Sequence, residues 1–396
     1  MYEFFLEKLN SLKIDSIYRT IKKPMLHEGH FLIEKETGKK ILNLSSNDYL
    51  GIGFDKSILN EFLKKIKDEN IEYYFFSSSG SRLLSGNSLS YEELEATLKE
   101  FYKKDVIVLN SGYHANIGLI SSLFDYETII FFDKLCHASI IDGIKLSGAK
   151  FYRYNHLDYN HLEKLLKNHR NNYKNSVIIT ESVFSMDGDI ADIETLLYLK
   201  EKYNCLLYID EAHSVGCMGQ NGLGVSFKEN LFDRIDIFLG TFGKAYASIG
   251  SFIVADKIII DYIINKTRTF IYTTALPPIV LSWNNFILKK SFHKFHNRRE
   301  SLNYIAKYTR EKLSSLGLKV LGESHIIPLV IGTNEDTIIL SEYLYKNGFY
   351  ALPIRYPTVP KMSARIRFSL NSLVEKNNID TLYDQIKEYY ERNMAK

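Results

Sequence analysis

The fold of this chain is most constrained by an alternation, between about residues 105 and 240, of short apolar runs with amphipathic stretches. The apolar runs are rich in Ile, Val, Leu and Phe, and they lie at 106–110, 128–133, 150–154, 176–180, 205–210 and 236–240. Continuous runs of this kind are typical of strands that are covered on both faces. The stretches between them, such as 158–168 and 193–203, are long enough for crossover helices. The pattern therefore predicts a large α/β domain built on a mostly parallel sheet.

The pattern changes near residue 277. A long helical pattern runs from Ile279 to about Leu316, and strand candidates follow at 326–331 and 364–370, separated by helices. A chain of 396 residues exceeds one average domain and suits two unequal ones. We therefore expect an N-terminal arm or helix over 1–45, a large domain over 46–277, and a smaller α+β domain over 278–396 that includes the arm.

Composition argues against several classes of protein. The net charge is only +3 and basic residues are scattered among acidic ones, so no basic patch for nucleic acid is indicated. No apolar run reaches membrane-spanning length, and the first 21 residues lack the uninterrupted apolar centre of a secretory signal. Cys136, Cys205 and Cys217 have neither disulfide nor zinc-ligand spacing. We expect a cytoplasmic protein without a metal site, a membrane span or a nucleic-acid partner.

Two candidate features follow the first two apolar runs. In open parallel sheets the ligand site lies beyond the carboxyl ends of the strands. Small polar residues at 111–116 lead from the first run into a helical pattern, and such a junction is a good phosphate site, although many such turns are empty. His137 follows the second run closely. A histidine there is more often a helix cap or a core residue than a catalytic group.

Asp210 ends the fifth run and begins the sequence Asp-Glu-Ala-His. A carboxylate at the end of an apolar strand is costly unless it meets a cation or hydrogen-bond donors, and a protonated pyridine nitrogen would meet that need. Asp210 could instead cap the next helix, or the four residues could be the metal-binding box of a helicase. The helicase alternative requires a phosphate loop upstream, and neither Gly-Lys pair, at residues 38 and 243, fits that loop.

Lys244 follows the sixth run among small and apolar residues. Most lysines are solvated surface groups, but one in such surroundings should have a depressed pKa, which supplies the amine that imine chemistry needs. Thr241 beside it could bind an anion. A phosphate site, a stacking imidazole, an acid for a pyridinium and an imine-forming lysine together describe a pocket for pyridoxal 5'-phosphate.

The chain resembles the α-oxoamine synthases in a series of longer motifs and in the order in which they occur. The resemblance runs nearly from end to end of the chain. Its matching segments are SSNDYLG at 45–51, GSRLLSGN at 80–87, FSMDGD at 184–189, DEAH at 210–213, TFGK at 241–244 and PTVP at 357–360. The resemblance implies the aspartate-aminotransferase-like fold (fold type I), pyridoxal 5'-phosphate as the cofactor, and a homodimer with shared active sites.

The resemblance also implies residue roles at the cofactor. Lys244 would bind it covalently, Asp210 would pair with the pyridine nitrogen, and His213 would bond the ring oxygen. His137 would stack on the ring and also contact substrate. Further cofactor contacts would come from Gly112, Tyr113, Ser185 and Thr241, with Thr273 or Thr274 at the phosphate of the neighbouring subunit.

The implied substrate contacts lie elsewhere in the sequence. Asn47 and Arg367 would hold the carboxylate of the amino acid, and Arg19, Arg355 and Thr358 would contact the acyl substrate. The family is an acyltransferase family, and Arg355 favours its branch in biotin biosynthesis, which joins L-alanine to pimeloyl-CoA or pimeloyl-acyl carrier protein with loss of carbon dioxide. A sister synthase that uses glycine with another acyl-CoA, of the 5-aminolevulinate or 2-amino-3-ketobutyrate type, stays open, as does a binding protein without catalysis.

Overall fold

The computed structural model describes residues 2–394, and the chain divides into two compact units. The sheet unit comprises residues 55–184 and 190–299, and the terminal unit comprises the residues up to 54, residues 185–189 and the residues from 300 on.

The predicted domain ranges and these units divide the chain at different residues. Residues 278–299 belong to the sheet unit because α10 (Pro278–Lys294) packs against α3 (Leu89–Tyr102). Residues 46–54 belong to the terminal unit together with the N-terminal segment.

The helices of the sheet unit, besides α3 and α10, are α2 (Lys56–Asp68), α4 (Gly112–Leu123), α5 (Ala138–Ser147), α6 (Tyr159–His169), α7 (Ile193–Lys202), α8 (Lys257–Lys266) and α9 (Arg268–Ile271). Its strands are β4 (Asp105–Leu109), β5 (Thr128–Asp133), β6 (Lys150–Tyr154), β7 (Asn175–Glu181), β8 (Leu206–Asp210), β9 (Ile237–Thr241) and β10 (Ser251–Ala255).

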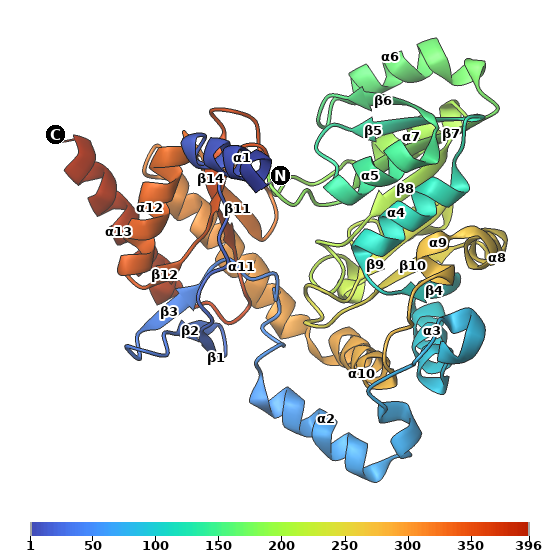
Figure 1. Ribbon diagram of the computed structural model, residues 1–396, viewed down its shortest axis with the longest axis horizontal. Helices are drawn as coiled ribbons and strands as arrows, with labels where there is room; N and C mark the ends of the chain where they lie inside the picture. Colours follow the sequence, from blue (N-terminus) through green and yellow to red (C-terminus); the bar gives the residue numbers. More distant parts are fainter. Residues whose placement is uncertain (1, 395–396) are drawn as a thin grey trace. The chain divides into compact units, whose positions relative to one another are not determined.

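These strands form one sheet in the order β4-β10-β9-β8-β7-β5-β6 (Figure 1). The pairs from β9 to β6 are parallel, and β10 runs antiparallel to both of its neighbours. The predicted α/β class with a mostly parallel sheet is therefore confirmed. All six predicted strands are present within one residue of their predicted bounds, and β10 is a strand that was not predicted.

One face of the sheet packs against α4, α5, α8 and α9. Alternate strand residues such as Ile179 and Leu239 meet Leu119 of α4 and Ile144 of α5 in a buried cluster. The edge strand β6 differs, because most of its residues are exposed, so the prediction that every run is covered on both faces is wrong there. The packed sheet gives the strand ends a rigid base.

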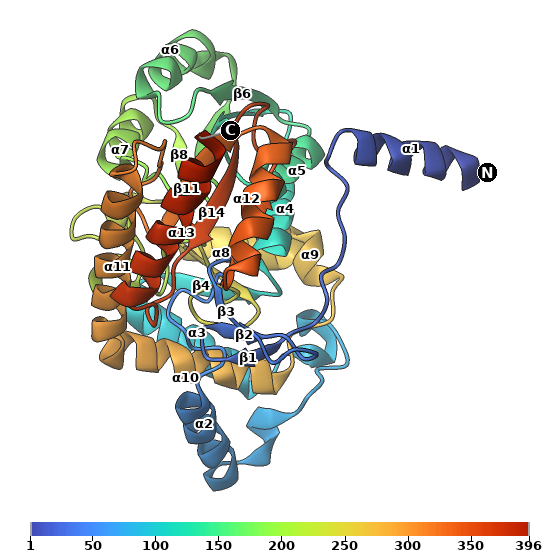
Figure 2. The same cartoon turned by 90° about the vertical axis from the view of Figure 1, so that its left-hand side faces the viewer.

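The helices of the terminal unit are α1 (Tyr2–Ile14), α12 (Asn334–Lys346), α13 (Lys376–Met394) and most of α11 (His296–Ser314). Its strands are β1 (Leu26–Glu28), β2 (Phe31–Ile33), β3 (Lys40–Asn43), β11 (Ile326–Gly332), β12 (Phe349–Tyr350), β13 (Pro353–Ile354) and β14 (Ala364–Ser369). They form two small sheets, β1-β2-β3-β12 and β11-β14-β13. None of the residues of α1 is buried, and Figure 2 shows this helix extending away from the other elements of its unit.

The single long helix predicted from Ile279 to Leu316 is wrong, because the structure has two helices, α10 and α11, with a break at Phe295. Phe295 is buried, and its N–H still bonds to the carbonyl of Ser291. The guanidinium of Arg299 donates to the same carbonyl at 2.9 Å and so satisfies the end of α10.

Within residues 2–394, none of the helices combines the length and apolar composition that a membrane-spanning segment requires.

Candidate active site

A cavity of about 210 Å³ lies at the carboxyl ends of the strands of the sheet unit. Residues that follow or end β4, β5, β7, β8 and β9 line it. Seven of them were predicted as site residues: Gly112, Tyr113, His137, Asp210, His213, Thr241 and Lys244. The structure thus brings together residues from five separate strand ends, and their individual roles stay predictions.

Asp210 is the last residue of β8, and only 5% of its surface is exposed. Its Oδ2 accepts a hydrogen bond from Nδ2 of Asn116 at 2.8 Å, and its Oδ1 accepts one from the N–H of Ala212 at 2.9 Å. Each oxygen of this buried carboxyl group therefore has a hydrogen-bond donor. The residues that follow, 211–219, form turns, so Asp210 caps no helix there.

The sequence left open whether His137 caps a helix or belongs to the site. In the structure it does both, because it lines the cavity and caps α5. Its Nδ1 accepts from the N–H of Ser139 at 3.3 Å and lies 2.7 Å from Oγ of Ser139. Because Nδ1 already accepts that main-chain N–H, the serine hydroxyl donates to Nδ1, and its Oγ accepts from Nδ2 of Asn116 at 3.0 Å. A neutral His137 therefore carries its proton on Nε2.

The electrostatic surroundings favour this neutral imidazole. Burial lowers the pKa of His137, Asp210 opposes that effect, and Lys244 adds to it. The lowered pKa leaves the ring uncharged and suitable for stacking at neutral pH.

Lys244 lies in the turn after β9, with the buried residues Phe242 and Ala245 beside it. The hydroxyl of Thr241 donates to the carbonyl of Gly250 at 3.0 Å and accepts from the N–H of Gly243 at 3.2 Å. Thr241 thus closes the turn that carries Lys244. A contact between Thr241 and an anion would require its hydroxyl to turn away from Gly250, and the depressed pKa of Lys244 stays a prediction.

The first turn of α4 forms another side of the cavity. Ser111 caps this helix by accepting from the N–H of His114. The N–H groups of Gly112 and Tyr113 belong to the first turn, in which the main-chain N–H groups have no acceptor within the helix. The hydroxyl of Tyr113 donates to Asp142 at 2.7 Å, and this bond raises the pKa of Tyr113. The positive end of the helix dipole and these N–H groups suit a phosphate.

These donors and acceptors fit pyridoxal phosphate. A side chain added at Gly112 would meet no atom closer than 3.9 Å, so the space in front of the first turn of α4 is open. Lys244 offers an amine, Asp210 offers a buried carboxylate for the ring nitrogen, and His137 offers a flat ring. The residues present can therefore hold each part of the cofactor.

Arg367 and Asn47, the predicted contacts of the amino acid carboxylate, lie together in the terminal unit. Two guanidinium nitrogens of Arg367 each lie 3.3 Å from Oδ1 of Asn47, and its Nε donates to the carbonyl of Ser185 at 2.5 Å. Arg365, two residues earlier on β14, forms an ion pair with Asp187 at 2.7 Å. Among the described residues no carboxylate pairs with Arg367, although only 8% of its surface is exposed. An unneutralised buried guanidinium is suited to an anionic ligand.

The predicted acyl contacts also lie in the terminal unit. Nη2 of Arg19 lies 3.3 Å from Oγ1 of Thr358, and Arg355 donates to the carbonyls of Ser16 and Tyr18. Burial lowers the pKa of Arg355, and the charge of Arg19 lowers it further. Neither arginine pairs with a carboxylate in the part of the chain that the structure describes.

Three predicted cofactor contacts do not line the cavity. Ser185 belongs to the terminal unit, and Thr273 and Thr274 follow α9 in the sheet unit. Asn110 Nδ2 lies 3.3 Å from Oγ1 of Thr273 and donates to the carbonyl of Thr274 at 2.7 Å. The contact of Thr273 or Thr274 with a neighbouring subunit stays a prediction.

Sequence reasoning missed four buried residues of the cavity, which are Asn116, Ser139, Glu181 and Ala212. Asn116 lies one helical turn after Gly112, so the spacing of four residues along α4 could have indicated it. Glu181 is the last residue of β7, and the strand-end argument used for Asp210 applies to it equally.

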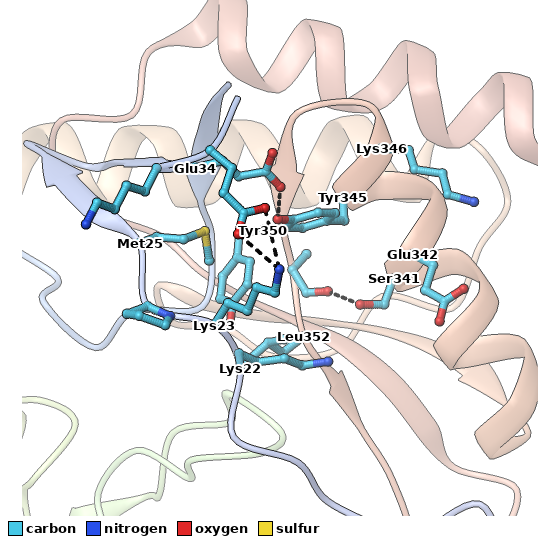
Figure 3. Close-up of a pocket in the computed structure, with 14 residues that line it drawn as sticks. Lys22, Lys23, Met25, Glu34, Ser341, Glu342, Tyr345, Lys346, Tyr350 and Leu352 are labelled. Atoms are coloured by element: carbon cyan, nitrogen blue, oxygen red, sulfur yellow. Dashed lines mark hydrogen bonds and ion pairs between the residues drawn. The ribbon is translucent and has the colours of Figure 1, made fainter. Parts of the chain in front are cut away.

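A second cavity, of about 420 Å³, lies in the terminal unit between the segment 22–36 and α12 (Figure 3). Figure 3 shows Tyr345 and Tyr350 facing it, with Glu34 bonded to the hydroxyl of Tyr345. Its lining has lysines and glutamates at the rim but no histidine or cysteine. Within residues 2–394, no cluster of three or more His, Cys, Asp or Glu side chains could hold a metal ion.

Comparison with known proteins gives consistent results. Residues 39–386 match the model of the class I and II aminotransferases. An 8-amino-7-oxononanoate synthase of Haemophilus ducreyi is 42% identical over 375 residues, which are 93% of this chain and 96% of that protein. A solved 8-amino-7-oxononanoate synthase of Francisella tularensis is 28% identical with a TM-score of 0.73, and covers 89% of this chain and 99% of its own. A serine palmitoyltransferase of S. paucimobilis, solved with bound pyridoxal phosphate and myriocin, has a TM-score of 0.87 at 25% identity, with 98% and 96% covered.

Proposed function

We infer that this chain, which belongs to the class I and II aminotransferase family and within it to the 8-amino-7-oxononanoate synthases, condenses L-alanine with a pimeloyl thioester. The chain is a pyridoxal-phosphate-dependent acyltransferase. The proposed products are 8-amino-7-oxononanoate, carbon dioxide and the free thiol of coenzyme A or acyl carrier protein. The observation that carries this proposal is the 42% identity to the Haemophilus ducreyi enzyme over nearly the full length of both chains.

The cavity of the sheet unit supports the first part of the reaction. Bound pyridoxal phosphate supplies an electron sink that stabilises a carbanion at Cα of the amino acid. Asp210, held in place by two N–H donors, would pair with the ring nitrogen and keep a proton on it. Nζ of Lys244 would anchor the cofactor and, once L-alanine replaces it, take the Cα proton. Nε2–H of His137 would be a donor for the substrate, and His213 would hold the ring oxygen.

The arginines of the terminal unit support the choice of substrates. Arg367, which has no carboxylate partner among the described residues, would bind the carboxylate of L-alanine together with Asn47. A pimeloyl group has a second acidic end that a simple fatty acyl chain lacks. Arg19 and Arg355, with Thr358, would provide two positive charges for that end.

A sister reaction of serine with a long acyl thioester is the second candidate. The TM-score of 0.87 to a serine palmitoyltransferase favours it. The higher sequence identity to the oxononanoate synthase favours the pimeloyl substrate. Arg19 and Arg355, which pair with no carboxylate within residues 2–394, favour it as well. A homodimer in which Thr273 or Thr274 reaches the neighbouring cofactor, and a cytoplasmic location, belong to the proposal as well.

A substrate panel tests the proposal. The purified protein with pyridoxal phosphate is incubated with pimeloyl-CoA and either L-alanine, glycine or L-serine, and with palmitoyl-CoA and L-serine. Thiol release and the mass of the product are measured, and Lys244→Ala is the blank. We expect 8-amino-7-oxononanoate from L-alanine and pimeloyl-CoA at a rate at least about tenfold above the other pairs, a difference of about 1.4 kcal/mol. Faster reaction of serine with palmitoyl-CoA would replace the proposal with its sister.

A further inference from the structure

Glu181 is a buried carboxyl group of the cavity to which nothing above gives a role. It ends β7, only 3% of its surface is exposed, and it lines the same cavity as Lys244. In the parallel pairing of β7 with β8, Glu181 lies directly beside Asp210. Two carboxyl groups therefore end neighbouring strands within one buried site.

The carboxyl group of Glu181 contacts the main chain of His137. Its Oε1 accepts the N–H of His137 at 2.5 Å, immediately before the first turn of α5. The imidazole of the same residue is held by Ser139, and Ser139 is held by Asn116, which also bonds to Asp210. Glu181 and Asn116 thus fix His137 from two sides, one through its main chain and the other through its ring.

The contacts decide which of the two carboxyl groups carries a proton. Asp210 accepts two N–H donors, one from a side chain and one from the main chain, whereas Glu181 accepts a single main-chain N–H. Two adjacent buried carboxyl groups do not both ionise readily, because each raises the proton affinity of the other. Glu181 has fewer donors to stabilise a negative charge, so it is the group of this pair that holds a proton.

The charged surroundings agree with this assignment. Burial and then Asp210 raise the pKa of Glu181 to about 8, while Lys244 and the N–H of His137 act in the opposite direction and Asp133 adds a smaller increase. The imidazoles of His137 and His213 and the phenol of Tyr113 also line the cavity, and Tyr113 donates to Asp142, whose charge acts to raise the pKa of His137. The buried thiol of Cys136 lies nearby, and burial and Glu181 raise its pKa.

We propose that Glu181 is a positioning residue of this active site, and that its protonated carboxyl group fixes the main chain of His137 and so holds the neutral imidazole at the cavity. The contact of Glu181 with His137 rests on the geometry of the sheet unit, whereas the effect of Glu181 on turnover rests on the proposed function. When Glu181 ionises, the site gains a second negative charge beside Asp210 and His137 becomes easier to protonate.

Three variants separate this role from a merely structural one. Glu181→Gln is neutral and keeps an oxygen that can accept the N–H of His137. Glu181→Ala removes the acceptor. Glu127→Gln is the matched control, because it removes a carboxylate that is not part of the cavity. Glu127 precedes β5, at the end of that strand opposite the cavity.

The first measurement uses the protein without cofactor or substrate, so it does not depend on which reaction the enzyme catalyses. Infrared spectra at neutral pH are expected to contain a protonated-carboxyl band that disappears in Glu181→Gln and remains in Glu127→Gln. Histidine-selective ¹⁵N NMR, with His137 assigned through His137→Gln, is expected to report an Nε2–H ring whose shifts change with a midpoint near pH 8 in the wild type but not in Glu181→Gln. If Glu181→Gln kept the protonated-carboxyl band, or kept the wild-type midpoint in the His137 shifts, the proposal would be overturned.

Kinetics of the cofactor-loaded enzyme provide the second measurement. We expect Glu181→Gln to retain kcat within about threefold at neutral pH, and Glu181→Ala to lower kcat by about tenfold or more with little change in the KM of either substrate. If Glu181→Gln were as inactive as Glu181→Ala, turnover would need the ionised form of Glu181, and the proposed role of its protonated form would be refuted. If Glu181→Ala does not fold, the comparison of Glu181→Gln with Glu127→Gln still decides the protonation state.

Discussion

The substitution Asn116→Asp tests whether the hydrogen bond from Asn116 to Asp210 supports cofactor binding. Nδ2 of Asn116 donates to Oδ2 of Asp210 across 2.8 Å in a fully buried position. The substitution replaces that donor with a carboxylate oxygen at the same place. Two unit charges 2.8 Å apart repel by about 6 kcal/mol at an effective dielectric constant of about 20, which is equivalent to about four pKa units. One proton is then shared by the pair at neutral pH.

The shared proton weakens the partner of the cofactor ring nitrogen. We expect the dissociation constant for pyridoxal phosphate, measured by fluorescence titration of the cofactor-free protein, to rise by about tenfold or more, and kcat to fall by about a hundredfold. Asn116→Leu is the control at the same site, because it removes the same hydrogen bond without adding a charge. It should weaken binding less, and it should not make binding more dependent on pH. If Asn116→Asp bound pyridoxal phosphate as tightly as the wild type from mildly acid to mildly alkaline pH, the reasoning would be refuted.

Three further predictions concern other parts of the chain. Glu211 is buried and accepts the N–H groups of Val225 and Ser226 at 2.9 and 2.8 Å, so Glu211→Ala should leave both amides unsatisfied, at about 1–3 kcal/mol each. Native-state hydrogen exchange at those amides should accelerate at least about thirtyfold, and unchanged exchange would contradict it. Arg367→Ala should raise the KM of L-alanine far more than that of the thioester in steady-state kinetics, and equal increases would refute its assignment. The folded protein holds a proton on Glu181 that the unfolded chain releases, so stability should fall as pH rises from 4.5 to about 8. Urea unfolding should show that Glu181→Gln removes this slope, and parallel pH profiles for both proteins would argue against it.

Much of the sheet unit could be predicted from the sequence because its strands are continuous apolar runs with polar residues directly after them. Asp210 and Lys244 are both near such strand ends, since Asp210 ends one run and Lys244 follows another. Glu181 was missed although the same rule covers it, because its run was taken to end at Thr180, one residue before the carboxylate. The bond from Asn116 to Asp210 joins residues 94 positions apart, and sequence spacing cannot indicate it.

The terminal unit was harder to predict. The resemblance pointed to Arg367, but the sequence does not distinguish it from Arg365, which has the same residue type and lies on the same face of β14. Only the structure shows that Asp187 neutralises Arg365, while no described carboxylate pairs with Arg367. The break at Phe295 was missed because both flanking segments have helical patterns and no proline or glycine separates them.

Covalent trapping of the cofactor tests the central claim most directly. The protein is loaded with pyridoxal phosphate, reduced with borohydride and digested, and the peptides are mapped by mass spectrometry. The account predicts a single reduced cofactor adduct on Lys244, which L-alanine diminishes when added before the reductant and which Lys244→Ala lacks. An adduct on a different lysine, or none after loading, would contradict the assignment of this cavity as the active site.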